Sequence, residues 1–348
     1  MINEREFSSK KNIKYVFREV KNSNKLIIVF SGYSNNSKVK APYNYMKSLR
    51  DVNINQLFIS DSYGYDGRGC WYLGEDGLND VEESVIELIN YIINKLNIDK
   101  KDIIVAGTSK GGFASLYYGI KYEFGNIISG GPQVYLYKYL EKLKNKNILN
   151  CITNKEEDQK NLDKLIVDLS IEKNTKIFIV CGIKDTHLNN HVIPFVKENL
   201  NISNIYLDIV YGEHNNLGEI YREKLPVFVN NIINDKPLDI INLPAVKKIE
   251  HKLDIKTIED ILNKDNITIK VKDDKLITYM EVANIYYQYA CYAYYGNRVE
   301  KSKYNNNPYF EFDIIFNSLN KIKWFIKDEL GNIISKEVKF KFTIDIDK

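Results

Sequence analysis

A turn of small residues between a buried strand and a helix is the feature that most restricts how this chain can fold. The strand covers residues 102–106, the turn Gly-Thr-Ser-Lys-Gly-Gly covers 107–112, and a helix continues over 113–117. Ser109 and its flanking glycines have the spacing G-x-S-x-G, which presents a serine hydroxyl on a sharp strand-to-helix turn. The pattern predicts an α/β sheet fold in which Ser109 is a candidate nucleophile.

Four further apolar runs predict strands buried on both faces of a mostly parallel sheet. They lie at residues 26–30, 56–60, 176–180 and 205–210. Between two of these strands, apolar residues at 81–96 follow helical spacing, and we expect Asp80 to be the N-cap of that helix. Strands that alternate with helices over residues 25–234 are typical of a parallel sheet covered by helices. Together with the Ser109 turn, they predict an α/β-hydrolase fold in a first domain at 1–234.

Residues 133–172 interrupt this alternation. They are highly charged and helical in tendency, yet they lie between two strands. Two interpretations stay open for this segment: an insertion that forms a lid over the active site, or an excursion on the surface.

In the C-terminal part of the chain, apolar residues recur at every second position. Residues 235–262 contain two prolines and are expected to form a linker. Beyond it, apolar and polar residues alternate around Phe312, Trp324 and Phe342. A Leu-Gly-Asn-Ile stretch at 330–333 predicts a hairpin turn. This pattern predicts a small antiparallel β-sandwich, immunoglobulin-like, at 263–348.

Charge and composition exclude several classes of function. The chain has 49 basic and 46 acidic residues, so its net charge of +3 gives no electrostatic basis for nucleic-acid binding. No apolar run approaches the roughly 18 residues of a membrane span, and the N-terminus does not have the plan of a signal peptide. The four cysteines show no metal-type spacing, and neither a metal nor a cofactor is expected. We therefore expect a cytoplasmic protein with free thiols.

A serine nucleophile requires an acid and a histidine, which follow it in this chain order in α/β-hydrolases. Asp185 follows the strand at 176–180, and His214 follows the strand at 205–210. Both residues therefore stand at the carboxyl edge of the predicted sheet, where His214 would accept the Ser109 proton and Asp185 would orient His214. The alternative for His214 is an ordinary loop histidine.

The other three histidines fit this role less well. His187 is a candidate for lining the pocket because it lies two residues from Asp185. His191 is expected to be an ordinary helical residue, since His-Leu-Asn-Asn-His does not have the glutamate of a zinc-protease motif. His251 lies in the predicted linker and is expected to be exposed.

An oxyanion would need backbone N–H donors near Ser109. The amide of Lys110, directly after the nucleophile, is one candidate. The second should come from the loop after the strand at 26–30, where Tyr33 is our first choice and Gly32 the second. The phosphate-loop alternative does not fit, because the lysine precedes the glycine pair.

A glycine-rich loop at 61–74 leaves the same edge of the sheet. It carries Arg68 and Trp71, which are candidates for contacts with a sugar or an anionic group. The competing interpretation is a rigid loop whose aromatic rings pack beneath the active site.

Four segments resemble those of bacterial α/β-hydrolase-like proteins linked to capsule and surface-glycan biosynthesis. They are residues 72–77 (Tyr-Leu-Gly-Glu-Asp-Gly), 107–112, 113–119 and 129–133 (Ser-Gly-Gly-Pro-Gln). The same architecture occurs in an accessory-secretion component that resembles a glycan O-acetyltransferase. The tyrosine-rich stretch at 286–295 is similar to the "three-Y" β-domain, although packing in a core is the simpler interpretation of its rings.

This resemblance implies an acyl-ester reaction on a glycan or glycoconjugate, by either hydrolysis or acyl transfer. A peptidase of the same fold is a weaker alternative. The non-enzymatic alternative is a hydrolase-like fold that binds a glycan, or a protein partner through its C-terminal β-domain.

Overall fold

The computed structural model describes most of the chain in two compact units. The described residues are 3–34, 41–143, 146–199, 202, 204–210, 212–236, 267–272, 275–280, 287–313, 319–328 and 331–339. Within these ranges the first unit runs to Lys236, apart from Ile209 and Val210, which are grouped with the second unit; the rest of the second unit begins at Ile267. Nearly all of the predicted linker at 235–262, with His251, therefore lies outside the described residues.

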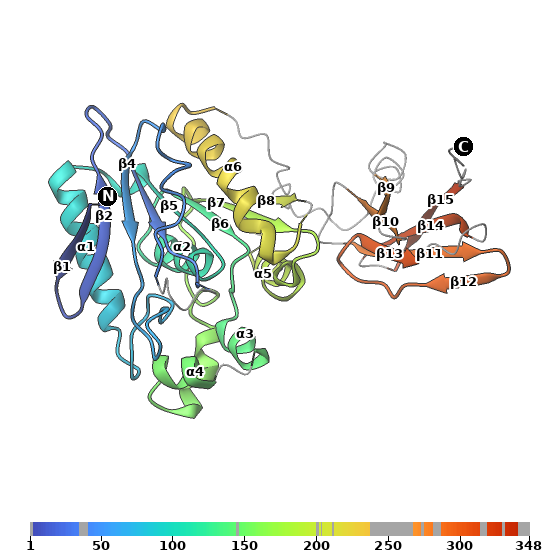
Figure 1. The fold of residues 1–348 in the computed structure, drawn as a ribbon, viewed down its shortest axis with the longest axis horizontal. Coiled ribbons are helices and arrows are strands. Elements are labelled where there is room, and N and C mark those ends of the chain that lie inside the picture. The colour runs from blue at the N-terminus through green and yellow to red at the C-terminus, as the bar shows by residue number, and fades with distance from the viewer. Residues whose placement is uncertain are drawn as a thin grey trace, which may run out of the picture. The chain divides into compact units, whose positions relative to one another are not determined.

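The first unit is built on a mixed eight-stranded sheet with the order β1-β2-β4-β3-β5-β6-β7-β8 (Figure 1). Its strands are β1 (Glu4–Ser8), β2 (Asn12–Arg18), β3 (Leu26–Phe30), β4 (Asn55–Ile59), β5 (Ile103–Thr108), β6 (Asn126–Gly130), β7 (Lys176–Gly182) and β8 (Ile205–Val210). Strands β4, β3, β5, β6 and β7 pair in parallel. Strand β2 pairs antiparallel with both β1 and β4. All five predicted runs form strands, whereas β1 and β2 were not predicted.

Helices connect the parallel strands. They are α1 (Asp80–Leu96), α2 (Lys110–Lys121), α3 (Leu136–Lys142), α4 (Lys146–Ile152), α5 (Ile193–Glu198) and α6 (His214–Ile233), with the short turns η1 (Lys100–Asp102), η2 (Glu156–Asp163) and η3 (Leu188–Val192). The charged segment at 133–172 therefore contains α3, α4 and η2, in agreement with its helical tendency. No helix in the described ranges is long and apolar enough to cross a membrane.

The prediction that Asp80 caps α1 was wrong by one residue. The N-cap is Asn79, and Asp80 is the first residue of the helix. There the Asp80 carboxylate accepts the N–H of Val81 and pairs with Lys11, so it satisfies the helix terminus from inside the first turn.

Helices α2 and α6 cover opposite faces of the central strands, because successive side chains of a strand point to opposite faces. On β6, Ile127 faces α2, where a Cβ on Gly119 would lie only 2.5 Å from it. Gly130 faces Tyr221 of α6 instead, and a Cβ there would lie 2.8 Å from the Tyr221 ring. Both helices therefore pack directly over the strand that neighbours the Ser109 turn.

The second unit consists of two antiparallel sheets, with the orders β13-β10-β9 and β12-β11-β14-β15. Their strands are β9 (Ile267–Lys272), β10 (Lys275–Met280), β11 (Gln288–Tyr295), β12 (Arg298–Lys301), β13 (Tyr309–Asp313), β14 (Leu319–Lys327) and β15 (Ile333–Lys339). Strand β14 pairs antiparallel with β15, as the predicted hairpin requires, and Leu330 of its turn lies outside the described residues. The predicted alternation beyond Lys339 lies outside the described residues.

Side chains from both sheets form one buried cluster around Trp324. Its members include Leu276 of β10, Phe312 of β13 and Tyr289 of β11. Tyr287 and Tyr295 are also buried there, whereas Tyr292 and Tyr294 are only half-buried. Packing in the core thus explains the buried tyrosines among the described residues, Tyr287, Tyr289 and Tyr295.

Candidate active site

The Ser109 turn has the strained backbone of a nucleophile elbow. Ser109 has φ of 55° and ψ of −115°, a conformation that non-glycine residues rarely adopt. The two glycines of the motif are required by space: a Cβ on Gly107 would lie 2.4 Å from the Gly111 carbonyl oxygen, and one on Gly111 would lie 2.4 Å from that of Phe30. The Ser109 N–H donates to the Gly130 carbonyl at 2.8 Å, which fixes the turn to β6.

Ser109, His214 and Asp185 lie in hydrogen-bond contact. The distance from His214 Nε2 to Ser109 Oγ is 3.0 Å, and the distance from His214 Nδ1 to Asp185 Oδ2 is 2.7 Å. His214 is the first residue of α6, directly after the loop that follows β8, and its side chain is 30% exposed. Asp185 is only 2% exposed. This geometry allows His214 to take the Ser109 proton while Asp185 holds the imidazole.

The electrostatics of Asp185 favour its ionised form. Burial alone would raise the pKa of this carboxyl. The hydrogen bond and charge of His214, with a further contribution from His187, outweigh burial and hold the pKa of Asp185 below its usual range. The backbone N–H of His187 also donates to Asp185 Oδ1 at 2.8 Å. Both carboxylate oxygens therefore have a partner that orients them.

His187 and His191 are buried beside this group. The His187 ring lies 4.0 Å from the His214 ring between centroids, and its Nδ1 lies 2.9 Å from the Gly131 carbonyl oxygen. His191 belongs to the π-helical turn η3, and its Nδ1 accepts the N–H of Tyr135 at 3.2 Å. Burial lowers the pKa of both imidazoles, that of His191 to about 3. They are therefore neutral partners in the wall beside His214.

Asp185, His187 and His214 also place ligand-type atoms within 4.8 Å of one another. In this group Asp185 already accepts hydrogen bonds from His214 Nδ1 and from the N–H of His187, and His187 Nδ1 contacts the Gly131 carbonyl oxygen. The observed contacts fit proton transfer between His214 and Ser109 better than metal coordination.

The predicted oxyanion donors differ in their availability. The N–H of Gly32 already donates to Asn44 Oδ1 at 2.8 Å, so our second-choice donor is engaged within the protein. Tyr33 and Lys110 have no acceptor for their N–H among the described residues. Lys110 is the first residue of α2, where the helix leaves N–H groups unpaired. Tyr33 and Lys110 therefore remain the candidate pair.

The Lys110 side chain has a different role, which the sequence did not indicate. Its Nζ lies 3.1 Å from Asp61 Oδ2, and both side chains are fully buried. Asp61 follows β4 and also accepts the N–H groups of Cys70 and Tyr72. The ion pair therefore fastens the glycine-rich loop at 61–74 to the nucleophile turn.

Within that loop, Arg68 and Trp71 behave differently. Arg68 is half-buried, pairs with Asp66, and places its guanidinium 4.6 Å from the centre of the Tyr33 ring. Trp71 stacks on Tyr33 but is only 2% exposed. Arg68 and Tyr33 are half-buried, whereas the Trp71 ring is enclosed by protein. The burial of Trp71 fits the interpretation of a rigid structural loop, and substrate contact by Arg68 stays a prediction.

Gln133 is a polar residue of the site that the sequence analysis did not single out. It is fully buried, and its Nε2 donates to Ser109 Oγ at 2.7 Å. It follows β6 at the carboxyl edge of the sheet, as Asp185 follows β7. A search of that edge for every polar side chain, and not only for acids, would have found it.

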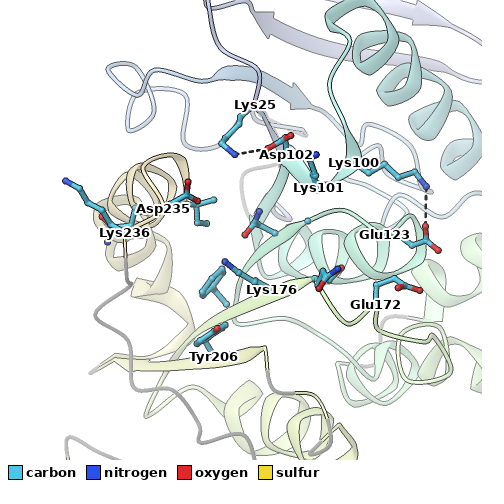
Figure 2. Close-up of a pocket in the computed structure, with 17 residues that line it drawn as sticks. Lys25, Lys100, Lys101, Asp102, Glu123, Glu172, Lys176, Tyr206, Asp235 and Lys236 are labelled. Carbon is cyan, nitrogen blue, oxygen red and sulfur yellow. Dashed lines mark hydrogen bonds and ion pairs between the residues drawn. The ribbon is translucent and has the colours of Figure 1, made fainter.

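A separate hollow of about 920 Å³ lies at the opposite, amino edge of the sheet (Figure 2). Lys25, Asp102 and Lys176 line it at the beginnings of β3, β5 and β7. Five lysines and four carboxylates surround it. Two ion pairs among them, Lys25–Asp102 and Lys100–Glu123, are drawn in Figure 2. Its charges balance almost fully, and it lies far from Ser109 along the strands. The candidate nucleophile and its two partners lie at the opposite, carboxyl edge.

A strained serine turn, a histidine and a buried acid at the carboxyl edge of a largely parallel sheet define an α/β-hydrolase-like protein. Residues 6–232 match the family model described as accessory Sec system GspB-transporter. The chain belongs to this accessory Sec family.

Comparison with known proteins agrees with this assignment. An accessory Sec system protein of Staphylococcus aureus (strain NCTC 8325 / PS 47) is 31% identical over 109 residues, which cover 31% of this chain and 19% of that protein. The chain thus aligns with about a fifth of the length of this curated relative.

Two solved structures resemble the fold. The capsule O-acetyltransferase of Neisseria meningitidis serogroup A has a TM-score of 0.56 and 25% identity, over 67% of this chain and 95% of that chain. The Glycosylation Associate Protein (Gap123) complex of Streptococcus agalactiae has a TM-score of 0.55 and 16% identity, over 68% of this chain and 48% of that chain. The second likeness is one of fold alone.

Proposed function

We propose that this accessory Sec family protein is a serine-dependent acyltransferase that moves an acyl group through Ser109 to a sugar hydroxyl of a glycan or glycoprotein. The observation that carries the proposal is the continuous contact from Ser109 Oγ through His214 to the buried Asp185. The likeness to a capsule O-acetyltransferase supports acyl transfer, and membership in an accessory Sec family supports a glycosylated protein as acceptor.

In the first half-reaction, His214 Nε2 takes the hydroxyl proton as Ser109 Oγ attacks the acyl carbonyl carbon. The carbonyl oxygen becomes an oxyanion, and the amides of Lys110 and Tyr33 donate to it. The proton on His214 then passes to the leaving group of the donor as the donor bond breaks. Ser109 is left as an acyl ester.

In the second half-reaction, a sugar hydroxyl gives its proton to His214 and attacks the Ser109 ester. The ester bond to Oγ breaks, and His214 returns the proton to Ser109. If water replaces the sugar, the same steps release a carboxylic acid. Acyltransferase and esterase activities therefore differ only in the acceptor.

The segment at 133–172 belongs to the proposed site. Tyr139 of α3 lies edge-on against the His187 ring, with 5.2 Å between their centroids. We propose that α3 forms part of the wall beside His187 and His214, which supports the lid interpretation of this segment.

Covalent labelling by a fluorophosphonate probe tests the nucleophile. We expect the wild type to label and the Ser109→Ala variant not to label. Ser115→Ala is the matched control, because Ser115 is a buried serine on α2 whose hydroxyl donates to the Gly112 carbonyl. A folded wild type that does not label would overturn the proposal.

The nature of the acceptor is tested with p-nitrophenyl acetate in the presence and absence of a soluble hexose glycoside. An acyltransferase forms the acetylated sugar, and the sugar increases the rate of p-nitrophenolate release. Release of free acetate alone, unaffected by the sugar, would assign an esterase instead.

Membership in a secretion family favours a second candidate, a non-catalytic binding protein of the export machinery. In that case Ser109→Ala leaves export of the glycoprotein cargo intact, whereas deletion of residues 263–348 abolishes it. Normal export of a cargo that has lost its acyl groups in Ser109→Ala cells would instead favour the enzyme.

A further inference from the structure

Gln133 links the nucleophile to the glycine-rich loop through its two ends. Its Nε2 donates to Ser109 Oγ at 2.7 Å, and its Oε1 accepts the indole N–H of Trp71 at 2.9 Å. Gln133 is fully buried and Trp71 is almost so. A buried side-chain amide is thus held between the Trp71 donor and the reacting oxygen.

The Trp71 contact fixes which end of the amide faces Ser109. An indole N–H only donates, so Gln133 must turn its oxygen to Trp71. Its NH₂ group then points at Ser109 Oγ, which accepts the hydrogen bond. Since Oγ accepts from Gln133, its own proton is directed to the remaining partner, His214 Nε2 at 3.0 Å. This is the hydrogen-bond pattern that proton transfer to His214 requires.

Trp71 is in turn held rigidly. Its backbone has φ of +56°, and that of Tyr72 has φ of +59°, two consecutive left-handed residues of the kind that cluster at functional sites. The carboxylate of Asp61 binds the N–H groups on either side of Trp71, those of Cys70 and Tyr72. The buried Lys110 ammonium neutralises that carboxylate. The loop thereby fixes the indole against Gln133.

We propose that Gln133 is a further catalytic residue and that Trp71 is its positioning residue. Gln133 sets the Ser109 proton toward His214, and it donates to Oγ as negative charge develops there during attack and again when Oγ leaves the acyl-enzyme. No bond to Gln133 forms or breaks. This inference rests on the proposed function, because it assigns a role in the chemistry of Ser109.

Gln133→Met and Trp71→Phe test the inference, since each removes the hydrogen bond; Gln133→Met keeps the approximate size of the side chain, and Trp71→Phe keeps an aromatic ring. The readouts are the maximal rate of labelling by a fluorophosphonate and the probe concentration that gives half of that rate. We expect Gln133→Met to lower the maximal rate on the order of 10²-fold at an unchanged half-saturating concentration. Trp71→Phe should lower it about tenfold, the equivalent of one lost hydrogen bond.

Gln56→Met is the matched control. Gln56 is a fully buried glutamine on β4 that binds the carbonyls of Leu49 and Val52, away from Ser109. Its variant should lose thermal stability but keep the wild-type labelling rate. If Gln133→Met and Gln56→Met shift the melting temperature alike, only the labelling rate distinguishes catalysis from packing.

The outcomes separate this inference from the proposed function. Wild-type labelling with a normal rate in Gln133→Met overturns the role of Gln133 and leaves the Ser109 proposal standing. A slow Gln133→Met with a normal Trp71→Phe overturns the positioning role of Trp71. A wild type that never labels overturns both proposals.

Discussion

At the scale of single residues, the Ser109 turn depends on glycines that permit a close approach of backbones. Strain such as that at Ser109 costs about 1–3 kcal/mol and persists only where the surroundings enforce it. Gly111 passes against the carbonyl of Phe30, and Gly107 against that of Gly111. Close backbone contacts of Gly107 and Gly111 thus hold Ser109 in its strained conformation.

We predict that Gly111→Ala lowers the free energy of unfolding by roughly 1–3 kcal/mol and abolishes labelling at Ser109, because its Cβ would lie 2.4 Å from the Phe30 oxygen. Denaturant unfolding and labelling measure the two effects. Gly218→Ala is the control: its Cβ would meet only Tyr45 Oη, at 3.8 Å, within helix α6. It should stabilise slightly, and equal effects of both variants would contradict the explanation.

The buried pair Lys110–Asp61 gives a second prediction. Removing one partner leaves an unpaired charge, so Lys110→Met should destabilise the protein by about 3–5 kcal/mol. Adding Asp61→Asn should recover part of that loss, because the remaining charge is then removed as well. Urea unfolding of both variants checks this. A double variant less stable than Lys110→Met would rule out the charge as the cause.

A site residue could be predicted from the sequence where local sequence position identifies it, but not where a contact with a residue distant in the sequence does. Ser109, Asp185 and His214 are identified by their positions after strands, and that information is local to each strand. The partnerships of Gln133 with Trp71 and of Lys110 with Asp61 join residues 62 and 49 positions apart. Such contacts depend on loop paths that no local pattern specifies.

At the scale of elements, strands buried on both faces were the most predictable. Their continuous apolar runs, such as Leu26–Phe30, are distinctive. Strand β1 (Glu4–Ser8) was missed because it is mostly exposed and charged, and its pairing with β2 defines it. The helix of residues 81–96 was predicted, but its cap moved to Asn79 because backbone geometry decides the first helical residue.

The buried His191 of turn η3 predicts that the stability of the protein depends on pH. Burial, with the neighbouring His187, lowers the pKa of His191 to about 3, whereas an unfolded histidine titrates near about 6.5. Between these values the unfolded state binds a proton that the folded state does not. The free energy of unfolding should therefore fall as pH drops through this window, by up to about 1.4 kcal/mol per pH unit.

The His191→Asn variant tests that dependence. Its side-chain oxygen can still accept the N–H of Tyr135, the bond that His191 Nδ1 makes. Urea unfolding between about pH 6.5 and pH 4 should show a shallower loss of stability in the variant than in the wild type. Parallel curves would show that His191 does not carry the effect.

At the scale of the whole molecule, every residue of the candidate site belongs to the first unit. In the second unit, the indole N–H of Trp324 donates to Thr278 Oγ1 at 3.0 Å inside the core. Thr278→Val leaves that donor unpaired and should destabilise the second unit by about 1–3 kcal/mol. Hydrogen exchange resolved by peptide should detect faster exchange in β10 and β14, with an unchanged rate of Ser109 labelling. Slower labelling would show that the β-unit supports the chemistry.

The most direct test of the central claim is the mass of the acyl-enzyme. The protein is mixed with p-nitrophenyl acetate, quenched in acid within one turnover, and digested for mass spectrometry. The account predicts one acetyl group on the peptide that contains Ser109, no such adduct in Ser109→Ala, and a much slower appearance of the adduct in His214→Ala, because His214 takes the Ser109 proton when the adduct forms. A wild type that releases p-nitrophenolate with acetate on any other residue, or on none, would contradict it.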